Sequence, residues 1–113
     1  MGNVPLYEAK ADLFRTLGHP VRIRVLELLQ EGPRPVHELL AEIDVEASNL
    51  SQQLGVLRRA GLVRSSREAS SVVYTLATPD VAQLLLHGRL ILAALWSEQR
   101  DLLATLQDTA GSA

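Results

Sequence analysis

The stretch VEASNLSQQLGVLRRAGLV, residues 45–63, decides the fold expected for this chain. It predicts an amphipathic helix over 48–60, because apolar residues recur at spacings of four and three: Leu50, Leu54 and Leu57. Gly61 fits the C-terminal cap of that helix, where a left-handed backbone favours glycine. Residues 44–46 form a turn of the length that joins the two helices of a helix-turn-helix. With a shorter helix before the turn, the motif spans residues 35–60.

Further segments are predicted on both sides of this motif. Helical periodicity bounded by Gly and Pro indicates two helices before it, and β-branched residues indicate a hairpin after it. Thr78 or Asp80 is the expected cap of a long last helix. The predicted segments are helices 7–17 and 20–32, strands 62–67 and 71–76 with a turn at 68–70, and a helix over 80–107. The sequence therefore predicts a mainly α fold with a small β-hairpin.

The 113 residues fit one domain, residues 1–113, near the lower limit for a self-sufficient core, so a core shared with a second copy is expected. Apolar residues make up 47% and charged residues 21%, which excludes a disordered chain. The absence of cysteine excludes disulfides and thiolate metal sites. No apolar run is long enough for a bilayer and the N-terminus lacks a secretory pattern, so a cytoplasmic location away from membranes is expected.

The helix over 48–60 carries uncharged polar residues where an exposed helix usually carries Lys and Glu. Amides and hydroxyls hydrogen-bond base edges and arginines bind phosphates, so this pattern predicts contact with double-stranded DNA. Although the formal net charge is −2, residues 47–67 hold four arginines and no carboxylate. The alternative is a merely exposed polar helix capped by Ser48, which the preceding turn and the basic hairpin disfavour. The expected DNA-binding residues are Ser48, Asn49, Ser51, Gln52, Gln53, Arg58, Arg59, Arg64, Arg67 and Ser70.

Residues 11–76 resemble the ArsR/SmtB family of bacterial winged helix-turn-helix repressors. The resemblance is carried by the quoted stretch and by LGHPVR at 17–22. It implies that the hairpin 62–76 is the wing, that the polar helix enters the major groove, and that the terminal helices, within 5–18 and 79–107, form a homodimer. The implied function is a repressor of an inverted-repeat operator. The apolar residues expected at the dimer interface are Leu6, Phe14, Leu84, Leu85, Ile91, Leu92, Leu95 and Trp96.

Many family members carry His in place of Gln52 or Gln53, which leaves the preferred operator open. The family's effector positions are also changed in this chain. The resemblance places Pro35, Val36 and His37 at one familiar metal site, and Thr78, Asp80, Ile91 and Ala94 at the other. Of these residues, only His37 and Asp80 bind metals well. Neither familiar site is intact.

A different set on the last helix, His87, Glu98 and Asp101, repeats the spacing of the second site seven residues later. It would need a shifted two-fold axis between two chains. The simpler interpretation is a half-buried His87 and a solvated face over 98–101. No cofactor is required, and imidazole with carboxylate ligands favours nickel or zinc as an effector. The candidate ligands are therefore His37, His87, Glu98 and Asp101.

Two other classes of function compete with DNA binding. A protein-interaction module that pairs with a separate effector-sensing protein is the main alternative, because the effector positions are depleted. An enzyme is the least expected class. The sequence has no Gly-x-Ser-x-Gly elbow, no phosphate-binding glycine loop and no His-Glu-x-x-His motif, and its three histidines are scattered.

Overall fold

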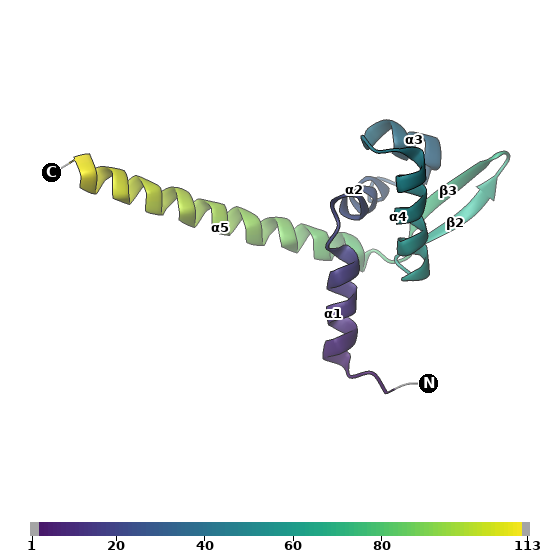
Figure 1. The fold of residues 1–113 in the computed structure, drawn as a ribbon, viewed down its shortest axis with the longest axis horizontal. Helices are drawn as coiled ribbons and strands as arrows, with labels where there is room; N and C mark the ends of the chain where they lie inside the picture. The colour runs from purple at the N-terminus through teal and green to yellow at the C-terminus, as the bar shows by residue number, and fades with distance from the viewer. Residues whose placement is uncertain (1–2, 112–113) are drawn as a thin grey trace. The chain divides into compact units, whose positions relative to one another are not determined.

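The computed structural model describes residues 3–111, with side chains as far as residue 108 (Figure 1). Its chain divides into two compact units, Met1–Ala82 and Gln83–Ala113. The elements are α1 (Leu6–Leu17), α2 (Pro20–Leu29), β1 (Arg34–Pro35), α3 (Val36–Glu42), α4 (Ala47–Arg59), β2 (Val63–Glu68), β3 (Ser71–Leu76) and α5 (Asp80–Gly111). The mainly α fold with a β-hairpin is confirmed.

The core of the first unit lies among α2, α3 and α4. Its most deeply buried side chains are Val25, Leu26, Leu39, Leu50, Leu54 and Leu57. Burial of each such side chain stabilises the fold by about 1.5–3 kcal/mol, so three leucines of α4 hold that helix firmly in place. The apolar spacing that predicted this face is confirmed.

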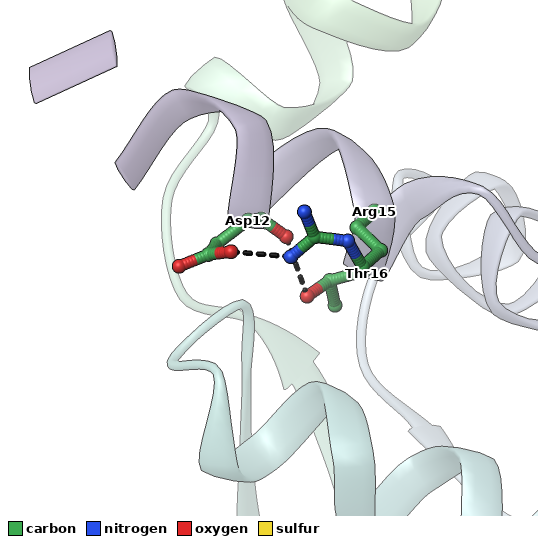
Figure 2. A network of polar contacts seen from close by, with 3 residues as sticks. All are labelled: Asp12, Arg15 and Thr16. Carbon is green, nitrogen blue, oxygen red and sulfur yellow. Dashed lines mark hydrogen bonds and ion pairs between the residues drawn. The ribbon is translucent and has the colours of Figure 1, made fainter. Parts of the chain in front are cut away.

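The junction of α1 and α2 is fixed by local hydrogen bonds. His19 caps α2, since its Nδ1 accepts a hydrogen bond of 3.2 Å from the Val21 amide, and Pro20 occupies the first turn without needing a donor. On α1, Arg15 pairs with the Asp12 carboxylate, and the Thr16 hydroxyl donates to the Asp12 carbonyl at 3.0 Å (Figure 2). Both side chains of the ion pair are exposed, so it contributes little stability.

The end of α2 differs from the prediction, whereas the glycine cap predicted for α4 is confirmed. The helix α2 ends at Leu29 rather than at residue 32, because the next three amides bond to carbonyls three residues back in a tighter turn. For α4, Gly61 at φ +80° is the predicted cap. The Gly61 amide donates to the Arg58 carbonyl and the Leu62 amide to the Leu57 carbonyl, each at 3.0 Å. This pair of bonds is a Schellman motif, which aims the chain directly into β2.

The sheet has three antiparallel strands in the order β1-β3-β2. Glu68 pairs with Ser71, so the hairpin turn has two residues, one fewer than expected. Figure 1 shows the tip of this hairpin extending away from the helices, with α4 beside its base. The strand β1, which pairs with residues 73 and 74 of β3, has no counterpart in the sequence prediction. Two residues are too few for an alternating pattern, and a Pro is tolerated there because β1 lies at the sheet edge.

The long helix α5 spans 32 residues and extends four residues beyond its predicted end. At its start, the Thr78 hydroxyl accepts a hydrogen bond from the Asp80 amide at 3.3 Å. Thr78, one of the two predicted caps, therefore caps this helix. Large apolar side chains stay exposed along it, among them Ile91, Leu92, Leu95 and Trp96. No helix within residues 3–111 is both long enough and apolar enough to cross a membrane.

Candidate nucleic-acid interface

The helix α4 presents most of its predicted polar residues on the outside. Ser48, Ser51 and Gln52 are exposed and Asn49 is half-buried. The helix begins at Ala47, and Glu46 occupies its N-cap position without a side-chain hydrogen bond. Ser48 is therefore one residue inside the helix and is not its cap. The buried leucines on the opposite side leave this uncharged face available to a ligand.

Gln53 lies differently from expectation, because its side chain is only 6% exposed. Its Oε1 accepts a hydrogen bond of 2.8 Å from Nε of Arg22, and its Nε2 donates to Oδ1 of Asn49 at 2.9 Å. The sequence did contain a signal for this burial. Position 53 follows Leu50 by three residues and precedes Leu57 by four, so it shares their side of the helix. Gln53 is therefore a buried residue whose side chain is already hydrogen-bonded within the protein. Its hydrogen bond with Arg22 is a contact that sequence reasoning missed.

The four arginines of residues 47–67 lie on two different elements, α4 and β2. Arg58 and Arg59 lie in the last turn of α4, where cations complement the helix dipole. Arg64 and Arg67 are exposed on β2, and their spacing of three puts them on opposite faces of that strand. Ser70 is exposed in the hairpin turn. The four arginines therefore do not form one continuous patch.

An open groove of about 380 Å³ lies between α4 and the hairpin. It brings together three of the predicted residues, Ser51, Arg58 and Arg67, and adds hydroxyl groups that sequence reasoning missed. Its lining residues are Ser51, Gly55, Arg58, Ser65, Ser66, Arg67, Val72 and Tyr74. Two guanidinium groups and several hydroxyls, with no carboxylate among the lining residues, are suited to phosphate oxygens.

Gly55 is one of the residues that line this groove. A Cβ atom at this position would lie 3.1 Å from Nη1 of Arg59. Glycine inside a helix costs about 1 kcal/mol relative to alanine, and the flexible end of Arg59 is the group that a side chain at this position would displace. The bare backbone keeps the groove open and leaves room for the Arg59 guanidinium.

The candidate metal ligands do not come together within one chain. His37 is exposed on α3, and His87, Glu98 and Asp101 are exposed on α5, so the expectation of a half-buried His87 is wrong for the single chain. At 1.5 Å per residue, His87 and Glu98 lie about 16 Å apart along the helix. Among the residues described, no group of three His, Asp or Glu side chains is placed to hold a metal ion. The hypothetical site on α5 therefore needs ligands from two chains.

The residues expected at a dimer interface are accessible in the single chain. Leu6 and Phe14 are exposed on α1, whereas Leu84 and Leu85 near the start of α5 are half-buried. The remaining four lie exposed along α5: Ile91, Leu92, Leu95 and Trp96. Single exposed apolar residues are ordinary, but a run of this length on one helix indicates a surface that another molecule covers.

Sequence comparisons identify relatives that match most of the chain. A helix-turn-helix domain family model matches residues 17–66. An uncharacterized HTH-type transcriptional regulator of Mycobacterium tuberculosis, Rv0081, is 51% identical over 109 residues, covering 96% of this chain and 93% of its own. The biofilm growth-associated repressor of Agrobacterium fabrum is 42% identical over 91 residues, covering 75% and 78%. The HTH-type transcriptional repressor SmtB of M. tuberculosis is 37% identical over 81 residues, covering 72% and 60%.

Solved structures agree with this assignment. The crystal structure of M. tuberculosis Rv0081 matches with a TM-score of 0.78 and 52% identity, over 86% of this chain and 98% of that one. A homodimeric winged helix-turn-helix DNA-binding domain from Mycobacterium bovis, described as a possible ArsR-family regulator, matches with a TM-score of 0.70 and 26% identity, over 82% and 91%. These relatives are regulators rather than enzymes. The polar face of α4, the arginine-lined groove and these comparisons together show that the chain belongs to the ArsR/SmtB family of winged helix-turn-helix transcriptional regulators.

Proposed function

We propose that this chain is a homodimeric repressor that binds double-stranded DNA at an inverted-repeat operator in the cytoplasm. One observation carries the proposal: α4 combines an uncharged amide and hydroxyl face with an adjoining groove that holds two arginines. The face suits base edges in the major groove, and the groove suits the phosphates beside it. Two relatives that are named as repressors support repression rather than activation.

The dimer is inferred from the exposed apolar residues of α1 and α5 and from the homodimeric relative of M. bovis. A two-fold axis would place two copies of α4 in successive major grooves. The half-sites of the operator should then lie one helical turn apart, about 34–36 Å, or a multiple of it. A nickel or zinc response would need ligands contributed by both chains, and titration of the dimer with either ion tests it. Absence of a saturable site at micromolar metal would refute that hypothesis.

Selection of bound duplexes from a random DNA pool tests the proposed function. The expected product is a palindromic consensus, because a symmetric dimer reads the same half-site twice. The selection should be run at low ionic strength, where phosphate contacts are strongest. Failure to enrich any duplex under these conditions would refute the proposal.

Replacing Gln52 and Arg67 in turn should separate base contacts from phosphate contacts. For Gln52→Ala we expect a loss of discrimination of about 1–3 kcal/mol at defined operator positions. For Arg67→Ala we expect weaker binding to every sequence and a smaller dependence of affinity on salt, by about one unit of slope. Binding titrations at several salt concentrations, on the selected operator and on point-mutated duplexes, measure both effects. An equal loss on all sequences from Gln52→Ala would contradict the assigned roles.

Replacing Gly55 with alanine should change stability and binding in opposite directions. Alanine raises the helix propensity of α4, and the only atoms crowded by the new Cβ belong to the flexible end of Arg59, so the free energy of unfolding should rise by about 0.5–1 kcal/mol. Because Gly55 lines the groove, the added methyl group should narrow it and displace the Arg59 guanidinium, so affinity for the operator should fall. Thermal unfolding and a binding titration check the two signs. A destabilised variant, or one that binds with unchanged affinity, would show that Gly55 has another role.

A further inference from the structure

A continuous series of hydrogen bonds connects the end of α1 to the outer face of α4. The Thr16 carbonyl, in the last turn of α1, accepts from Nη1 of Arg22 at 3.1 Å. Nε of the same guanidinium donates to Oε1 of Gln53 at 2.8 Å, and Nε2 of Gln53 donates to Oδ1 of Asn49 at 2.9 Å. Within residues 3–111, no buried side-chain nitrogen or oxygen lacks a partner. The series therefore accounts for the polar groups of the buried Gln53.

The chemistry of arginine fixes the direction of every bond in this series. A guanidinium has only donors, so the atom of Gln53 that faces Arg22 must be the carbonyl oxygen. The Gln53 amide nitrogen then faces Asn49, and the atom of Asn49 that receives its hydrogen bond must be Oδ1. The orientations of the two amides, which are otherwise easily exchanged, follow from this one constraint.

These hydrogen bonds also fix the orientation of the Asn49 side-chain amide. Its Oδ1 is turned toward Gln53, on the interior side, with one acceptor position filled. Its Nδ2 has no protein partner among the described residues, and the residue is half-buried at the polar face of α4. Because Nδ2 and Oδ1 are the two ends of one planar amide, fixing the oxygen inward leaves the two N–H donors for a ligand. The usual two-bond contact of asparagine with adenine needs both ends of the amide and is disfavoured here.

We propose that Asn49 acts as a hydrogen-bond donor to an acceptor-bearing base edge, and that Gln53 and Arg22 are positioning residues that set this polarity. The inference rests on the proposed DNA-binding function and adds a chemical specificity to it. In the major groove, guanine offers two acceptors, N7 and O6, whereas cytosine offers a donor at N4. Adenine offers a single acceptor, N7, beside an amino donor, and thymine offers a single acceptor, O4, beside a methyl group. A side chain that presents only donors should therefore favour guanine, and guanine is the base that we expect Asn49 to read in each half-site.

The variant Gln53→Glu tests the polarity directly. Glutamate keeps an oxygen for Arg22 and nearly the same shape, but it has no N–H to donate to Asn49. The Asn49 amide should then rotate, donate Nδ2 to the new carboxylate and turn Oδ1 toward the DNA. At the base pair read by Asn49, the preference should move from guanine to cytosine or adenine, which present amino donors, by about tenfold or more in relative affinity. The base pair itself is identified with Asn49→Ala, which should lose discrimination at that position.

Two further variants make the test specific. Ala47→Glu introduces the same charge at the exposed first residue of α4, which has no assigned base contact, so it controls for general repulsion by phosphates and should leave the preference at the Asn49 base pair unchanged. Asn49→Asp keeps the bond from Gln53 but replaces the outward donor by an acceptor, so it should shift the same base pair in the same direction as Gln53→Glu. This second route keeps the inference testable if the buried substitution prevents folding.

The measurement is a selection from a random duplex pool for the wild-type protein and each variant, followed by titrations on operators that differ at one base pair. A wild-type consensus without guanine at the Asn49 position overturns the inference, as does an unchanged preference in both Gln53→Glu and Asn49→Asp. Absence of any consensus for the wild type instead refutes the proposed function. The two failures are therefore distinguishable.

Discussion

Replacing Leu54 with alanine is expected to lower the free energy of unfolding by about 2–5 kcal/mol. Leu54 is 1% exposed and lies between two other buried leucines of α4, so the variant leaves a cavity that the neighbouring side chains can fill only in part. A domain of this size has a total stability of about 5–15 kcal/mol, so one substitution removes a large share of it. Urea unfolding followed by far-UV circular dichroism measures the loss.

The matched control for this prediction is Leu54→Met, which keeps nearly the same volume. It should cost less than about 1.5 kcal/mol, because methionine adapts to irregular space in a core. DNA affinity measured at a temperature where both variants are folded should change little, since Leu54 faces away from the polar surface. A loss below about 1 kcal/mol for Leu54→Ala would mean that α4 is not held by this core.

The leucine spacing of α4 was sufficient to predict its buried face, because burial of apolar side chains at helical spacing is the largest single contribution to the position of a helix. Gly61 was equally informative, since a left-handed residue after the last turn is the simplest way to end a helix. Both features depend on local sequence alone. The turn between α3 and α4 was predicted for the same reason.

The features that escaped prediction depend on contacts between distant residues. The strand β1 exists only because β3 offers it a partner, and its two residues carry no pattern of their own. The burial of Gln53 depends on a guanidinium 31 residues earlier in the chain, which supplies the hydrogen bond that makes a buried amide acceptable. The residue types of α4 predicted an uncharged polar face, and Ser48, Ser51 and Gln52 are indeed exposed, but which of the predicted residues stay accessible to a ligand is decided by tertiary hydrogen bonding.

Introducing Glu at both Ile91 and Leu95 should convert the proposed dimer into monomers. The two positions lie four residues apart on one side of α5, with exposures of 61% and 48% in the single chain. Two carboxylates there would have to be buried without partners in any interface that covers this side. Glutamate is a good helix former, so α5 itself should persist. Sedimentation velocity at several protein concentrations measures the change in mass.

The same double variant should lose about 10²–10⁴ in affinity for the complete operator, because the second half-site is no longer bound at a high effective concentration. Affinity for a duplex with a single half-site should stay the same, since the unit that contains α4 is unaltered. Ser97→Glu, which adds a carboxylate at an exposed polar position on the other side of the same helix, should leave both the dimer and the operator affinity intact. If the double variant is still a dimer, α5 does not join the two chains through this side. If the double variant is a monomer but its operator affinity is unchanged, the protein does not recognise paired half-sites.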